Sequence, residues 1–178
     1  MSNKAALREL QLRLAQRLQA VREQPREAGW LAVECASTGL LLPLGQAGEI
    51  HAMRQVLPVP HTAAWLIGVA NLRGQLHAVV DLARFLNLRS SDDASWPAGA
   101  QLVVLNTSLR VNCALLVDRL AGLRDTSQLQ RLADEPSGAT PPRFAGPCWR
   151  DGPGRRWQEL DLAALVQDPR FLDVAMAG

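Results

Sequence analysis

A chain of 178 residues has the size of one domain or two small lobes, and a chain of this length folds without disulfides or metal ions. Hydrophobic residues make up 48% of it and charged residues 20%, which is ordinary for a globular protein and excludes a disordered or collagen-like chain. The formal charge is only +2, charges of both signs interleave and aromatic residues are few, so no nucleic acid is expected as a partner.

The first predicted element is an amphipathic helix within residues 1–25, because leucines recur at spacings of three and four until Pro25 stops the helix. Its apolar stripe either packs on the protein's own body or docks a partner. Charged residues between the leucines interrupt any apolar run long enough for a signal peptide or a membrane span. The expectation is therefore a cytoplasmic protein with no direct membrane insertion.

From residue 26 onward, short apolar runs separated by Gly, Pro, Ser and Asn predict a mainly β body. A hairpin is expected over 31–44, with Gly39 supplying the positive φ of its turn. Residues 55–59 are expected to be extended. A second hairpin pairs 69–72 with 75–80 around Arg73-Gly74.

Asp81 is expected to cap a short helix that runs through Leu86, and the polar segment 89–100 is the best loop or lobe boundary. The second half is again β, and the apolar run 111–117 suits a strand with both faces partly buried. The remaining predicted strands are 102–106, 120–123, 129–132, 144–150 and 155–160. Asp161 caps a final short helix, which Pro169 ends.

Few residues indicate chemistry. His51, His61 and His77 are far apart, as are the three cysteines, so no metal site and no cofactor are expected. The odd, scattered cysteines fit buried thiols in a reducing compartment. Asp81 and Asp118 each follow an apolar strand, and capping and loop anchoring are favoured for them over a pair of catalytic acids. An enzyme is therefore not expected.

The segment 60–82, PHTAAWLIGVANLRGQLHAVVDL, resembles the signature of the CheW-like family, in which Gly-x-x-Asn-Leu-Arg-Gly leads into an apolar strand that ends in Asp-Leu. The strands at 102–106 and 114–118 resemble the paired strands of the same family, so that the likeness covers roughly 31–166. Three further stretches resemble the branch of the family that serves chemosensory systems of type IV pili; they are 42–50, 58–62 and 148–172.

This resemblance implies two small SH3-like, five-stranded β-barrel lobes within 26–178, preceded by the amphipathic helix and followed by a short C-terminal helix. It also implies an adaptor that couples the cytoplasmic tip of a methyl-accepting chemoreceptor to the regulatory domain of a CheA-type histidine kinase. The pathway would control twitching motility by type IV pili, and the chain would lie at membrane-associated receptor arrays. Carried over position by position, the partner-binding residues are Ala47, Glu49, Ile50, Arg73 and Gly74.

Alternatives remain open for single residues and for the whole chain. Arg73 either contacts a partner with its planar donor fork or ties its own lobe together. Trp65 and Leu66 are favoured as packing residues over interface anchors. The whole chain is alternatively a small-molecule or peptide-binding sensor domain on the same fold. An enzyme is the third choice, which would need a pocket that gathers the histidines beside an acid or a thiol; none is expected.

Overall fold

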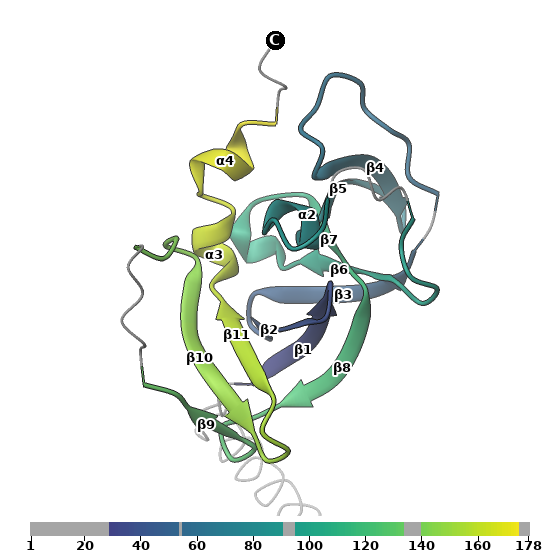
Figure 1. Ribbon diagram of the computed structural model, residues 1–178. Coiled ribbons are helices and arrows are strands. Elements are labelled where there is room, and N and C mark those ends of the chain that lie inside the picture. The colour runs from purple at the N-terminus through teal and green to yellow at the C-terminus, as the bar shows by residue number, and fades with distance from the viewer. Residues whose placement is uncertain (1–28, 54, 91–94, 134–139, 175–178) are drawn as a thin grey trace, which may run out of the picture.

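The structure is a computed structural model that describes residues 29–53, 55–90, 95–133 and 140–174. Within these residues eleven strands form two sheets, with short helices beside them (Figure 1). The prediction of a mainly β fold is therefore confirmed. The helix predicted over 1–25 lies outside the described residues, and the division of the chain into 1–25 and 26–178 stays a prediction.

The two ends of the described chain build the six-stranded sheet, whose order is β8-β1-β2-β11-β10-β9. Strands β2 and β11 pair in parallel and join the N-terminal hairpin to the C-terminal one. In Figure 1 this sheet curls into a curved wall. Its strands are β1 (Trp30–Cys35), β2 (Thr38–Pro43), β8 (Arg119–Arg124), β9 (Leu129–Arg131), β10 (Ala145–Asp151) and β11 (Arg156–Leu160).

The middle of the chain builds the five-stranded sheet, whose order is β3-β6-β7-β5-β4. Its strands are β3 (Ala47–Ala52), β4 (Leu66–Leu72), β5 (Gln75–Asp81), β6 (Gln101–Leu105) and β7 (Cys113–Val117). The segment 89–100, where the sequence indicates a loop or a lobe boundary, connects two strands of this one sheet. The sheets are therefore interleaved along the chain and do not divide it into halves. Residues 55–59 form no strand; Leu57 makes one isolated bridge to Val69.

Three apolar clusters hold the sheets, and period-two alternation along the strands explains them. In β7, Cys113 and Leu115 join the large cluster between the sheets, whereas Ala114 and Leu116 belong to the cluster of the five-stranded sheet itself. In β1, Trp30 points into the third cluster, together with four other buried residues of the six-stranded sheet. All five residues of β7 are buried, so the prediction of a strand buried on both faces is confirmed and none of them faces outward.

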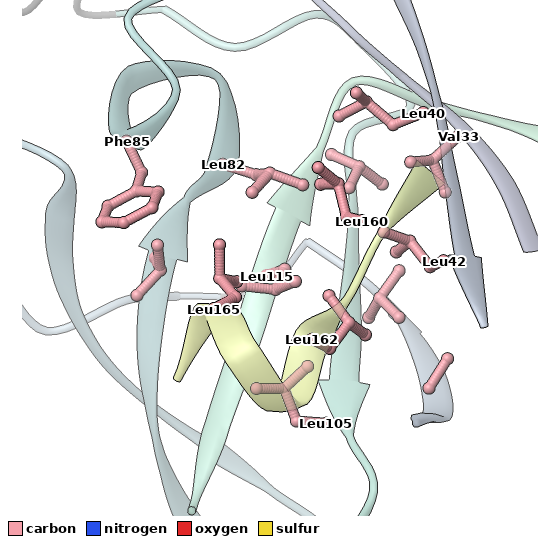
Figure 2. Close-up of a cluster of buried hydrophobic side chains, with 14 of the residues drawn as sticks. Val33, Leu40, Leu42, Leu82, Phe85, Leu105, Leu115, Leu160, Leu162 and Leu165 are labelled. Carbon is pink, nitrogen blue, oxygen red and sulfur yellow. The ribbon is translucent and has the colours of Figure 1, made fainter. Parts of the chain in front are cut away.

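The cluster between the sheets also receives the short helices (Figure 2). Helix α2 (Leu82–Phe85) is capped by Asp81, and α3 (Leu162–Leu165) is capped by Asp161, as predicted. Beyond the predicted end, Pro169 opens a further turn, α4 (Pro169–Leu172), because its fixed φ suits the first helical position. Through this turn Phe171 stacks on Trp65, with 5.8 Å between the ring centroids.

The first hairpin departs from the prediction at its turn. The positive φ angles belong to Ala36 (47°) and Ser37 (70°), not to Gly39. The two-residue loop joins Cys35 to Thr38, and such loops favour turns in which both central residues have positive φ. Gly39 serves a different purpose: a Cβ atom there would lie 2.7 Å from Cε3 of Trp157, so the close packing of the indole ring requires glycine.

Candidate functional site

The β4–β5 hairpin presents Arg73 at its tip. Leu72 pairs with Gln75, which leaves a two-residue loop in which Arg73 (φ 51°) and Gly74 (φ 86°) both have positive φ. The side chain of Asn71 accepts a hydrogen bond from the backbone N–H of Gly74 at 2.8 Å and so fixes the turn. The side chain of Arg73 is 73% exposed, because nothing in the described residues covers the tip.

Strand β3 carries the other predicted interface residues and lies at one edge of its sheet. Its pairing with β6 shifts register between Ala47 and Ile50. Ala47 is buried opposite Leu105, so its side chain helps to hold the strand and is not on the surface. Glu49 and Ile50 are exposed. The sequence does not predict a strand here, because polar and small residues leave no alternating apolar pattern.

The tertiary structure brings the two predicted segments together. Arg73 Nη1 lies 2.5 Å from Glu49 Oε1, and His51 Nε2 lies 3.2 Å from Glu49 Oε2. The carboxylate of Glu49 therefore joins the edge strand to the tip of the hairpin. An exposed pair of this kind stabilises a fold by at most about 1 kcal/mol, so a partner can exchange either charge at low cost.

A groove of about 330 Å³ lies beside the ion pair. Glu49, His51 and Arg73 line it together with His77 of β5 and the connection between β6 and β7, which includes the 3₁₀ turn Thr107–Leu109. The expectation that no pocket gathers histidines beside an acid is therefore wrong for two of the three. His61 does not line this groove. Pairing of strands distant in sequence creates the cluster, which no local pattern reveals.

A second polar network ties the two sheets together. Asp118 accepts a hydrogen bond from Ala36 N at 2.7 Å and two from Arg89 Nη2, at 2.5 and 2.6 Å. Asp81 is fully buried, caps α2 and accepts from Trp96 Nε1 at 2.8 Å. Burial by itself lowers the pKa of Arg89, but the hydrogen bonds and charge of Asp118 raise it overall. The predicted capping and anchoring roles of the two aspartates are confirmed. No local pattern in the sequence marks Arg89 as their shared partner.

Glu34 of β1 forms a further ionic cluster, with Arg119 and Arg155. Burial raises the pKa of Glu34, but the hydrogen bonds from both arginines outweigh it and hold that pKa below its ordinary value.

Cys35 and Cys113 are buried, as predicted, and burial raises the pKa of both thiols to about 12. Among the described residues no group of three or more metal ligands is found. The helices of these residues are all too short to span a lipid bilayer.

Comparison with known proteins gives results that agree with this architecture. The family model for the CheW-like domain matches residues 29–170. Protein PilI of Pseudomonas aeruginosa is 31% identical over 169 residues, which cover 92% of this chain and 89% of PilI. A probable chemotaxis protein CheW of Rhizobium etli is 29% identical over 75 residues, which cover 42% of this chain and 46% of that protein.

Among solved structures, the scaffolding protein TtCheW of Thermoanaerobacter tengcongensis superposes with a TM-score of 0.63. The match covers 79% of this chain and 88% of TtCheW at 15% identity, so it shows a shared fold. The family model spans both sheets described above, and the similarity to PilI extends over nearly the whole chain. The chain therefore belongs to the CheW-like family of scaffold and adaptor proteins.

Proposed function

We propose that this chain is an adaptor that couples methyl-accepting chemoreceptors to a CheA-type histidine kinase, in a chemosensory pathway that controls twitching by type IV pili. The observation that carries the proposal is that Glu49, Ile50, Arg73 and Gly74, chosen from two separate segments, lie on one exposed rim of the five-stranded sheet. The similarity to PilI over most of both chains supports the choice of the pilus system.

The mechanism requires no bond to be made or broken. The adaptor would contact the receptor's cytoplasmic tip and the kinase's regulatory domain at once, at receptor arrays on the cytoplasmic side of the membrane. A change of receptor state would then alter kinase activity through the geometry of both contacts. The apolar cluster between the sheets suits this task, because close packing transmits a displacement from one sheet to the other.

Arg73 has two roles in this proposal. It ties the hairpin tip to β3 through Glu49, and its exposed guanidinium offers further N–H groups to a carboxylate or carbonyl of a partner. The Arg73→Glu variant distinguishes an effect on partner binding from an effect on folding. It should lose receptor or kinase capture in a pull-down, while its free energy of unfolding falls by no more than about 1 kcal/mol, the most that an exposed ion pair contributes.

Two further variants sharpen this experiment. Arg131→Glu makes the same charge change at an exposed residue of β9, in the other sheet, and should capture partners normally. The double variant Glu49→Arg with Arg73→Glu restores an ion pair of reversed sign. Capture that stays lost in the double variant shows direct contact by these side chains, and capture that returns shows that they only hold the rim together. Unchanged capture by Arg73→Glu alone contradicts the assigned interface.

One observation favours the alternative of a small-molecule sensor, namely the groove of about 330 Å³ beside the rim. This volume lies at the lower end of the range for ligand sites. A calorimetric screen of metabolites against the purified chain separates the two functions, because an adaptor binds proteins without needing a small ligand.

A further inference from the structure

The groove beside the Glu49–Arg73 pair has a nearly buried histidine at its base. His77 is only 6% exposed, and its Nδ1 lies 3.1 Å from the backbone carbonyl oxygen of Gln75. A carbonyl oxygen only accepts hydrogen bonds, so Nδ1 carries the proton and Nε2 of the neutral ring has a free lone pair. Within the described residues Nε2 has no partner, yet it is not sealed from solvent. His77 is one of the residues that line the groove.

Asn112 lines the same groove and precedes the strand that pairs with β5. Strands β5 and β7 run parallel with Ala78 opposite Cys113, and Ala78 N donates to Asn112 O at 2.9 Å, so His77 and Asn112 are neighbours. The side chain of Asn112 is exposed and makes no hydrogen bond to the part of the chain that the structure describes. The groove thus presents an acceptor, His77 Nε2, beside a group that both donates and accepts.

Charge decides what kind of group these atoms can bind. Glu49 and Arg73 are the charged side chains that line the groove, and they already pair with each other. His51 lies beside the same carboxylate, with its Nε2 3.2 Å from Glu49 Oε2. A cation entering the groove meets Arg73 and two imidazoles, whereas an anion meets Glu49 and a lone pair. A charged ligand gains a counter-charge only by displacing the Glu49–Arg73 pair, and it also loses part of its hydration.

A neutral group with one N–H donor and one C=O acceptor has no such cost. A carboxamide donates to His77 Nε2 and accepts from the NH₂ group of Asn112, while its methylene carbons contact the apolar side chains of Leu72, Leu105 and Val111 in the same groove. We propose that this groove is a binding site for the carboxamide side chain of an asparagine or glutamine on a partner protein. That the carboxamide comes from a protein rests on the proposed adaptor function; the amide-binding chemistry does not.

The test uses the full chain and three probes with the same three-carbon skeleton: propionamide, propionate and propylammonium. Two-bond ¹H–¹⁵N spectra of the imidazoles report the Nε2 resonance of His77, and exposed His61, which does not line the groove, is the internal control. The expected result is a saturable upfield shift of His77 Nε2 with propionamide only. A saturable shift with propionate or propylammonium instead, or none with any probe, overturns the proposal.

A variant and a competition experiment complete the test. Asn112→Ala removes an exposed side chain with no partner among the described residues, so it should fold normally and lose most of the saturable response to propionamide. A full response in that variant overturns the site. Added propionamide, but not propionate, should also weaken partner capture. If propionamide binds but the chain captures no partner even in the absence of propionamide, the adaptor function fails and the amide site stands. If bound propionamide leaves partner capture unchanged, the carboxamide does not come from that partner.

Discussion

Replacement of Arg89 by methionine tests whether the network between the sheets stabilises the fold. The guanidinium is 9% exposed and donates to Asp118 at 2.5 and 2.6 Å, with a longer contact of 3.5 Å to Asp81. Methionine keeps most of the side-chain volume and removes the charge. Asp118 and Asp81, whose side chains are 14% and 1% exposed, then lose their shared cation.

The expected loss of unfolding free energy depends on the hydrogen bonds that each carboxylate keeps after Arg89 is replaced. Breaking a buried ion pair by removing one partner costs about 3–5 kcal/mol, because the other charge stays buried without compensation. Asp118 still accepts from Ala36 N, and Asp81 still accepts from Arg84 N and Trp96 Nε1. These hydrogen bonds favour the lower end, so Arg89→Met should lower the free energy of unfolding by about 3 kcal/mol.

Urea unfolding at neutral pH measures this loss, with Arg131→Met as an exposed control that should change stability by less than about 0.5 kcal/mol. The double variant Arg89→Met with Asp118→Asn removes the orphaned charge together with its partner. It should be more stable than the sum of the two single changes predicts, by about 1–3 kcal/mol. A loss below about 1 kcal/mol for Arg89→Met, or strictly additive effects, would refute the reasoning.

Three shorter predictions concern other parts of the fold. A thiol reagent at pH 8 should modify only half-buried Cys148 in the folded protein, because burial raises the pKa of Cys35 and Cys113 to about 12; rapid reaction of all three thiols contradicts this. Glu34→Gln should be less stable than the wild type at pH 7, because a carboxyl with a lowered pKa stabilises the fold only while it is ionised. The difference in stability should vanish as the pH falls from 4.5, the ordinary pKa of this carboxyl, through its lower pKa in the folded protein. An equal difference at all pH values, measured by urea unfolding, rejects this prediction. Ser37→Gly should raise the melting temperature, with a gain of up to about 1 kcal/mol, because relief of the strain at φ 70° outweighs the extra backbone entropy that glycine loses on folding; a lower melting temperature counts against the role given to the turn.

Local chemistry in the sequence was enough to predict several elements. Arg73-Gly74 forms the expected two-residue turn because glycine adopts positive φ without cost and the flanking residues favour strands. Asp81 and Asp161 cap the expected helices because a carboxylate accepts from the first free N–H groups of a helix. The site residues Glu49 and Arg73 came from the resemblance to a family, and the structure shows that they are in contact.

Contacts between distant segments were beyond those signals. Nothing near β2 indicates that β11, more than a hundred residues later, pairs with it in parallel, and nothing near Gly39 indicates that an indole ring packs on its Cα. The edge strand β3 has no alternating apolar pattern, and Arg89 lies in a segment that reads only as a polar loop.

The class of the fold, most strands and the helix caps could thus be read from local sequence patterns, and the family resemblance supplied the residues proposed for the rim. Contacts between distant segments were needed to show that the chain ends share one sheet, that Arg89 joins two aspartates, and that His51 and His77 line one groove. Turns and caps are predictable because they depend on φ preferences and hydrogen bonds within a few residues. Strand order instead depends on burying both apolar faces of each sheet at once, a condition that only the whole chain can satisfy.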